Sequence, residues 1–164
     1  MLRAVFTEGA RHLPEVIAAF EEAERLLRRT GPADGGPDGK ADAADVEGVL
    51  IGLSLALRLR RRPEDMRRAV VLAQELLNVV RRRSGEAAAV TLRAYLEDAY
   101  RDLADLADGA DAVRAVEEGI AACDRTLTLA RRFHAEEVTA HARATKALLL
   151  RRLAALRAEP GTGG

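Results

Sequence analysis

The sequence predicts an all-α protein of about six antiparallel helices, grouped as three helix hairpins. Aromatic residues make up only 3% of the chain and Trp is absent. Alanine and leucine dominate instead, which favours helices over strands. The hexapeptide Asp65–Val70 also recurs 46 residues later as Asp111–Val116. Self-similarity at such a period is typical of helical arrays.

The first helix is predicted over residues 13 to 30. Its inward face is expected to carry apolar residues at spacings of three and four: Leu13, Val16, Ile17, Phe20, Ala23 and Leu27. Pro14 suits the first turn of this helix. Residues 1–12 are expected to form a turn or a helix remnant. Residues 30–43 are rich in Gly and Pro and predict a flexible loop.

The second helix is predicted over residues 44–61. Its centre, residues 49–57, is apolar nearly all round, so we expect it to be buried on several sides. Pro63 stops this helix, and the acidic residues after it suit the start of a third helix over residues 64–83. The inward face of the third helix is expected to carry Met66, Ala69, Val70, Ala73, Leu76, Leu77 and Val80.

Ser84 and Gly85 end the third helix. The fourth helix, residues 86–107, is expected to bury Leu92, Leu96, Ala99, Leu103 and Leu106. After a turn at 108–111, the fifth helix runs to about Arg131 and is expected to bury Val113, Val116, Ile120, Cys123, Leu127 and Ala130. After a turn at 132–134, the sixth helix, 135–158, turns Val138, Ala142, Thr145, Leu149, Leu153 and Leu156 inward. Residues 159–164 are expected to be a disordered tail, which leaves residues 13–158 as a single helical domain.

The segment from Leu53 to Leu77 contains a Leu-Ala-Leu run, a basic turn with Pro and Asp, and a helix with Arg-Ala before apolar residues. It resembles the divergent tetratricopeptide-like (TPR-like) repeats of GC-rich bacteria, which often stand beside CHAT protease and other signalling domains. The resemblance covers residues 13–157. It implies a right-handed array of hairpins with a protein-binding role, in which Ala69 and Ala115 let paired helices cross closely.

Charge and cysteine content narrow the classes of partner and compartment. The 26 basic and 26 acidic residues cancel, which argues against nucleic acid and anionic membranes as partners. Lys40 and Lys146 are the only lysines, and this preference for Arg is typical of GC-rich bacterial genomes. The single cysteine, Cys123, fits a reducing cytoplasm. The N-terminus has no signal-peptide pattern, so a cytoplasmic protein is expected.

The residues that could carry a metal site or a catalytic site are each better explained as parts of the fold or of its surface. His134, Glu137 and His141 share a helical face, but the sequence lacks the motifs of known metal sites, so we expect surface histidines and no cofactor. Arg101 lies three and four residues from Asp98 and Asp105, and Asp102 is its neighbour, which predicts surface ion pairs. Cys123 is expected to be buried and unreactive. The sequence therefore predicts no enzyme.

The predicted function is a scaffold or protein-interaction module that binds a protein segment or itself, with a homodimer as one form. The residues expected to contact the partner are Arg81, Arg82, Arg83, Tyr95, Tyr100 and Arg101. Further basic clusters at 58–62, 131–132 and 151–152 also suit helix C-terminal ends. The alternative is a regulatory bundle that binds a small molecule or anion between helices, beside Tyr95, Tyr100 and arginines.

Overall fold

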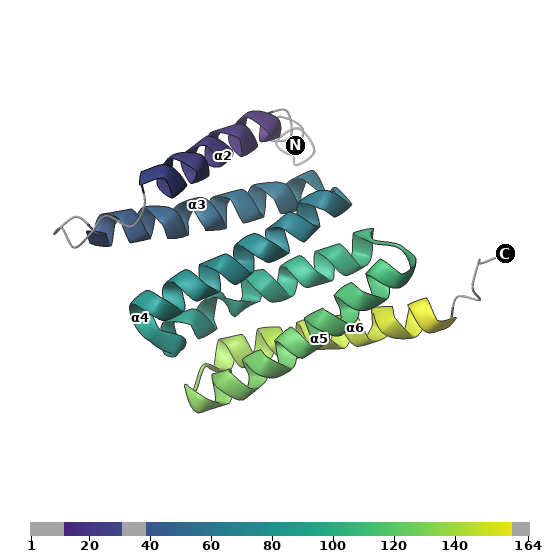
Figure 1. Cartoon of the computed structure of the whole chain (residues 1–164). Helices are drawn as coiled ribbons and strands as arrows, with labels where there is room; N and C mark the ends of the chain where they lie inside the picture. Colours follow the sequence, from purple (N-terminus) through teal and green to yellow (C-terminus); the bar gives the residue numbers. More distant parts are fainter. Residues whose placement is uncertain (1–11, 31–38, 159–164) are drawn as a thin grey trace, which may run out of the picture. The chain divides into compact units, whose positions relative to one another are not determined.

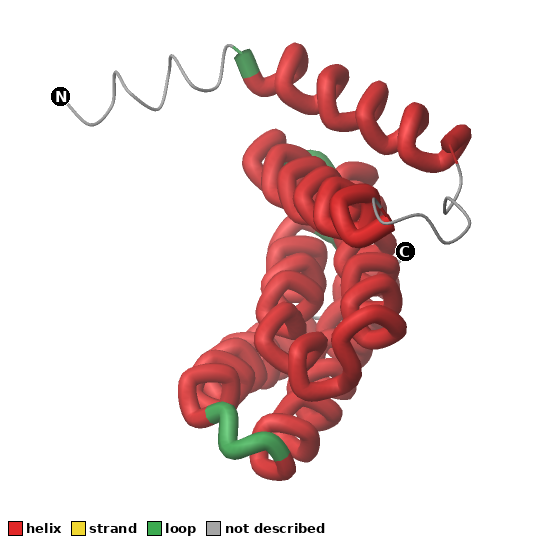
Figure 2. Tube along the Cα trace, turned by 90° about the vertical axis from the view of Figure 1, so that its left-hand side faces the viewer, coloured by secondary structure: helices red, strands yellow, loops and turns green. Residues whose placement is uncertain are grey.

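A computed structural model describes residues 12–30 and 39–158, and within these ranges the chain is helical with no strand (Figures 1 and 2). The helices are α2 (Leu13–Thr30), α3 (Gly39–Arg60), α4 (Pro63–Leu106), α5 (Gly109–Arg132) and α6 (Glu136–Ala158). The predicted all-α class is confirmed for these residues. The expectations for residues 1–11, 31–38 and 159–164 lie outside the described residues.

Helix α4 covers two predicted helices, with a break at the predicted position. Gly85 has φ 84° and ψ 175° inside the helix. This conformation is open almost only to glycine, because a Cβ clashes with the backbone there. The expected end of a helix at Ser84 and Gly85 is therefore a kink between two helical segments.

Replacing Gly85 by Ala is expected to lower the free energy of unfolding by about 1 to 3 kcal/mol, because the required φ is strained for alanine. No neighbouring atom lies within 4 Å of the added Cβ, so the loss comes from the backbone alone. Gly48→Ala is the matched control. Gly48 is exposed inside α3 with equal space around it, so this change is expected to stabilise by up to about 1 kcal/mol. Urea denaturation measures both, and equal stability of the two variants would contradict a kink fixed by Gly85.

The helix boundaries differ from the expected ones at two helix starts. Helix α3 begins at Gly39, so the predicted loop over 30–43 is wrong for its last five residues. The reason is that Lys40 and the alanines that follow are good helix formers once past the glycine. Helix α5 begins at Gly109, inside the expected turn at 108–111.

The chain divides into two compact units, residues 1–79 and 80–164. In the first unit, α2 packs against α3, and the ring of Phe20 covers Gly52 so closely that a Cβ there would lie 2.3 Å from the Phe20 Cζ atom. Arg68 of α4 forms ion pairs with Glu21 and Glu24 of α2. These contacts tie the three helical segments of this unit together.

The turn between α3 and α4 is held by a buried carboxylate. Asp65 accepts a hydrogen bond from Arg60 Nε at 2.6 Å. This bond raises the pKa of the Arg60 guanidinium, against the lowering effect of burial. Pro63 opens α4, and Glu64 and Asp65 lie in its positive first turn.

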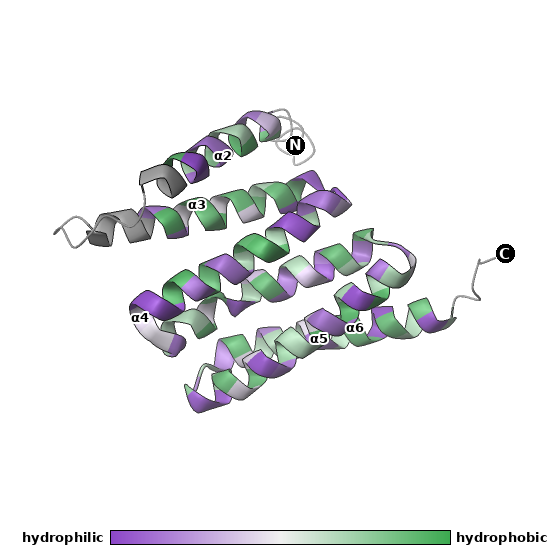
Figure 3. Ribbon diagram, viewed as in Figure 1, coloured by the Kyte–Doolittle hydropathy of each residue, from purple (hydrophilic) through white to green (hydrophobic). Residues whose placement is uncertain are grey.

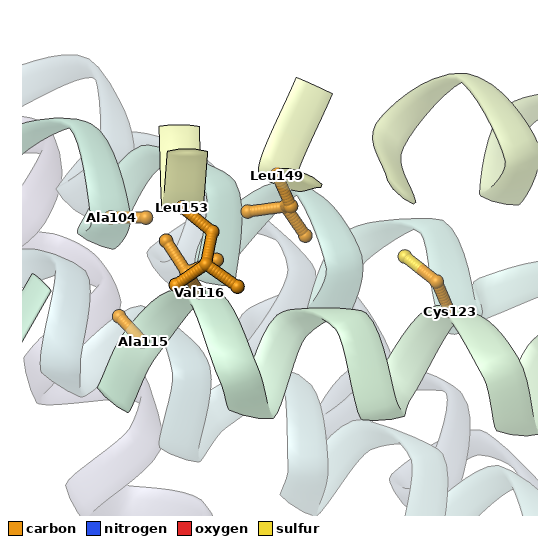
Figure 4. Packing of buried hydrophobic residues seen from close by; sticks show 6 residues of the cluster. All are labelled: Ala104, Ala115, Val116, Cys123, Leu149 and Leu153. Carbon is orange, nitrogen blue, oxygen red and sulfur yellow. The ribbon is translucent and has the colours of Figure 1, made fainter. Parts of the chain in front are cut away.

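In the second unit, α5 packs along α6, and the end of α4 adds to the same core. Figure 4 shows Leu149 and Leu153 of α6 directed toward Val116 of α5. Gly119 allows this approach, because a Cβ at that position would lie 2.8 Å from Leu149 Cδ1 and 3.0 Å from Tyr100 Cβ. Close contact between α4, α5 and α6 thus depends on a position without a side chain.

The predicted inward faces are largely confirmed. In α6, the predicted Ala142, Thr145, Leu149 and Leu153 are buried. In α2, Ile17 is buried but Val16 is 41% exposed, so its predicted inward position is wrong. Val16 lies about 100° around the helix from Ile17, at the edge of the face that packs. In the apolar run of α3, Leu55 remains exposed, as does Leu59 after it.

Candidate functional site

The six residues predicted to contact a partner do not form one exposed surface. Arg81, Arg82 and Arg83 are exposed on α4 just before the kink, and Tyr95 is half-buried. Tyr100 is buried beside Gly119, so its predicted role is not supported. Tyr100 follows Leu96 at a spacing of four and shares its inward face, which explains the burial.

The row of acidic residues on α4 forms the predicted ion pairs in part. Arg101 lies 2.9 Å from Asp98 and 3.2 Å from Asp102, while Asp105 is exposed. These pairs engage the guanidinium of Arg101 inside its own helix. Arg101 is therefore a weaker candidate for partner contact than the sequence suggested.

A buried polar cluster in the second unit was missed by the sequence analysis. Glu97 of α4 is 1% exposed, and neither oxygen of its carboxylate accepts a hydrogen bond among the described residues. His141 Nε2 of α6 lies 3.8 Å from Glu97 Oε2 and 3.4 Å from Asp98 Oδ1. Thr126 of α5 faces the carboxylate, but its hydroxyl donates to the Ala122 carbonyl at 3.1 Å. The cost of burying the Glu97 carboxylate is therefore offset only weakly by its neighbours.

The electrostatics of this cluster follow from its burial. Burial raises the pKa of Glu97, and Asp98 adds to the increase, while Thr126, His141 and Arg93 act in the opposite direction. Burial also lowers the pKa of the Arg93 guanidinium, whose pairing with Glu86 opposes this change. Glu97 lies seven residues from Val90 and from Ala104, which are also buried, so all three share one side of the helix.

The three residues considered for metal binding, His134, Glu137 and His141, do not share one surface. His134 is exposed in the turn before α6 with φ 53°, and Glu137 is exposed. His141 instead faces Glu97 and Asp98. In residues 12–30 and 39–158, no group of three His, Cys, Asp or Glu side chains has the arrangement of a metal site.

Cys123 is fully buried in the core of the second unit, as predicted. Burial, with the charges of Glu97 and Asp124, raises its pKa to about 12. At pH 8 the thiolate fraction is then on the order of 10⁻⁴, so a disulfide reagent is expected to react at least about 1,000-fold more slowly with the native than with the urea-unfolded chain. The absorbance of the released thiol measures both rates. Similar rates would contradict the burial of this thiol.

The strongest candidate surface lies on the side of α6 away from the core. We call it the α6 outer face and define it by Arg143, Ala147, Leu150, Arg151 and Ala154, which are all exposed and lie within about 100° of one another around the helix. Leu150 is 48% exposed, although Leu149 beside it is buried. Leu148 is 45% exposed but points about 160° away from Leu150, so it lies outside this face. Figure 3 shows hydrophobic and hydrophilic residues mixed along this helix. This exposed side of α6, with Leu150 beside two arginines, was not predicted from the sequence.

Comparisons with protein-family models, with curated proteins and with solved structures find no match. Among the helices that the structure describes, none has the length and apolar character to cross a membrane.

Proposed function

We propose that this protein is a non-catalytic, TPR-like helical-repeat module that binds protein, either a segment of another chain or a second copy. The observation that carries the proposal is the α6 outer face, where Leu150 stays exposed beside alanines and arginines. Exposed apolar rows with charged borders are typical of protein interaction surfaces.

The repeat is supported by equal burial at equivalent positions. A step of 46 residues carries five buried residues of α4 onto buried residues of α5, whereas the buried Asp65 and Leu72 map onto the exposed Asp111 and Glu118. The pairs are Met66 and Ala112, Ala69 and Ala115, Val70 and Val116, Ala73 and Gly119, and Leu76 and Ala122. Equivalent positions with equal burial are expected when two hairpins share one packing pattern. We propose that the helical segments form three such hairpins.

The alternative, a small molecule or anion between helices, has less support. It required Tyr95, Tyr100 and arginines to line a shared pocket. Tyr100 packs against Gly119, and Arg101 is engaged by Asp98 and Asp102. A buried carboxylate at Glu97 also opposes an anion in the core of the second unit.

Site-specific photo-crosslinking in cells that express the protein tests the proposed function. A photoreactive residue at position 150 is expected to give a discrete protein adduct, identified by mass spectrometry. The adduct should disappear when Arg143 and Arg151 are replaced by Glu. A photoreactive residue at Arg114, exposed on α5, is the control position. If positions 150 and 114 give the same pattern of adducts, the α6 outer face does not bind protein.

A further inference from the structure

Arg93 is a largely buried arginine whose hydrogen-bond donors are incompletely paired. It lies on α4 after the kink, and its side chain is 15% exposed. Its Nε atom is buried and has no hydrogen-bond acceptor among the residues that the structure describes. Glu86 Oε1 lies 3.8 Å from its Nη2 atom, which is too far for a hydrogen bond. Because buried N–H groups nearly always have an acceptor, Arg93 is placed to receive a further one.

The register of α4 against α5 places a second arginine at the same level. Tyr100 lies against Gly119, and Ala104 shares a core cluster with Ala115, so the two helices run antiparallel there. Arg93 is seven residues before Tyr100, and the exposed Arg125 is six residues after Gly119. These steps are about 10 Å and about 9 Å along neighbouring helices in the same direction. Arg125 therefore lies beside Arg93.

The charges around Arg93 do not balance. Burial lowers the pKa of its guanidinium, and Arg125 and Arg81 lower it further, so both lie close enough to repel it. Glu86 and Glu97 oppose this change, but burial raises the pKa of Glu97 and so favours its neutral form. Three arginines thus stand against the one carboxylate of Glu86, which leaves an excess of two positive charges.

We propose that Arg81, Arg93 and Arg125, which we call the arginine cluster, bind a phosphoryl group. This inference goes beyond the proposed protein binding and does not depend on the α6 outer face. A phosphoryl group carries a charge of about −1.5 to −2 at neutral pH and three strong acceptor oxygens. Its oxygens accept hydrogen bonds from Nε and Nη of Arg93, because the guanidinium fork matches phosphate geometry. Arg81 and Arg125 add their charge from the exposed side.

A carboxylate fits the arginine cluster less well than a phosphoryl group. Glu86 already brings one carboxylate to 3.8 Å from Arg93 without forming a hydrogen bond. A second carboxylate would leave one positive charge uncompensated, whereas a dianion balances the excess of two. The arginine cluster also differs from the site between helices considered above, because it opens to the surface and needs neither Tyr95 nor Tyr100.

The Nε–H signal of Arg93 in a ¹H–¹⁵N NMR spectrum reports on this site directly. Titration with inorganic phosphate at about pH 7, at an ionic strength held constant with chloride, is expected to shift this signal until it saturates. The midpoint of thermal unfolding should rise over the same phosphate concentrations, because the ligand binds only the folded state. Acetate is expected to bind about tenfold more weakly, because it brings one negative charge instead of two.

Substitutions at the arginine cluster separate phosphate binding from general attraction of anions. Arg93→Gln is expected to raise the dissociation constant for phosphate at least about tenfold, the effect of losing one hydrogen bond from a charged group. Arg125→Gln changes an exposed residue, keeps the core intact and is expected to raise it at least about fivefold. Arg114→Gln, at an exposed arginine about 16 Å away along α5, is the charge-matched control and should bind as the wild type does. Circular dichroism confirms that each variant is folded.

A blocked phosphoserine distinguishes two sources of the phosphoryl group. If it binds at least as tightly as inorganic phosphate, the arginine cluster accepts a phosphorylated side chain of a protein. If inorganic phosphate alone binds, the ligand is free phosphate. The proposal is overturned if the Arg93 Nε–H signal shows no saturable shift up to about 50 mM phosphate. It is also overturned if acetate binds as tightly as phosphate, or if Arg125→Gln and Arg114→Gln bind phosphate equally well.

Discussion

Leu149→Ala is expected to lower the free energy of unfolding by about 2 to 5 kcal/mol. Leu149 of α6 is fully buried against α5. Its Cδ1 atom lies where a Cβ of residue 119 would come within 2.8 Å of it. Its removal leaves a cavity that the neighbouring helices cannot close without losing their other contacts. Urea denaturation at low protein concentration, followed by circular dichroism, measures the change.

The neighbours of Leu149 provide the control within the same turn. Leu148→Ala and Leu150→Ala remove the same atoms from exposed positions, so each is expected to cost less than about 1 kcal/mol. A comparable loss at all three positions would mean that α6 is covered on its outer side within one copy. If Leu149→Ala loses less than about 1 kcal/mol of unfolding free energy, Leu149 does not lie in the core.

Glu97→Gln is expected to stabilise the protein at neutral pH by on the order of 1 kcal/mol, because burying a neutral amide costs less than burying a charged carboxylate. The substitution keeps the shape of the side chain and removes the charge. Burial raises the folded-state pKa of Glu97 above its unfolded value. The folded state therefore binds this proton more tightly than the unfolded state does.

The pH dependence follows from that sign. Below the unfolded pKa both states are protonated, and wild type and Glu97→Gln should be equally stable. As the pH rises from the unfolded to the folded pKa, the wild type loses stability, and the full difference is present above the folded pKa. Urea denaturation of both chains at about pH 4 and about pH 7.5 measures this change.

The groups that face Glu97 determine the size of the effect. His141 and Arg93 favour its charged form, whereas Asp98 opposes it. If Glu97→Gln is less stable than the wild type at neutral pH, the carboxylate has a strong partner and the cluster is a buried ion pair. A matched change at Asp105, an exposed carboxylate of the same helix, is expected to have little effect.

Helix positions and most buried faces could be predicted from the sequence because both depend on local patterns. Gly85 stops a helix through its own backbone, and Pro63 starts one for the same reason. The inward stripe of α6 followed from spacings of three and four alone. The 46-residue recurrence located equivalent buried residues in both units.

The candidate surfaces could not be predicted in this way, because they depend on which side of a helix has a neighbour. Leu148, Leu149 and Leu150 are chemically identical, and only the packing of α5 against one side separates them. Tyr100 suggested a binding residue, but the absence of a side chain at Gly119 lets it pack inside. The burial of Glu97 could not be predicted, because sequence alone does not show that α5 and α6 cover it.

Methyl NMR of the isotope-labelled chain, recorded alone and with the protein captured by crosslinking at position 150, tests most directly whether the α6 outer face binds protein. We expect the methyl signals of Leu150 to shift or broaden when the captured protein is added, while those of the buried Leu149 change less. Changes confined to Leu55 and Leu59 of α3, or none at Leu150, would contradict binding at the α6 outer face.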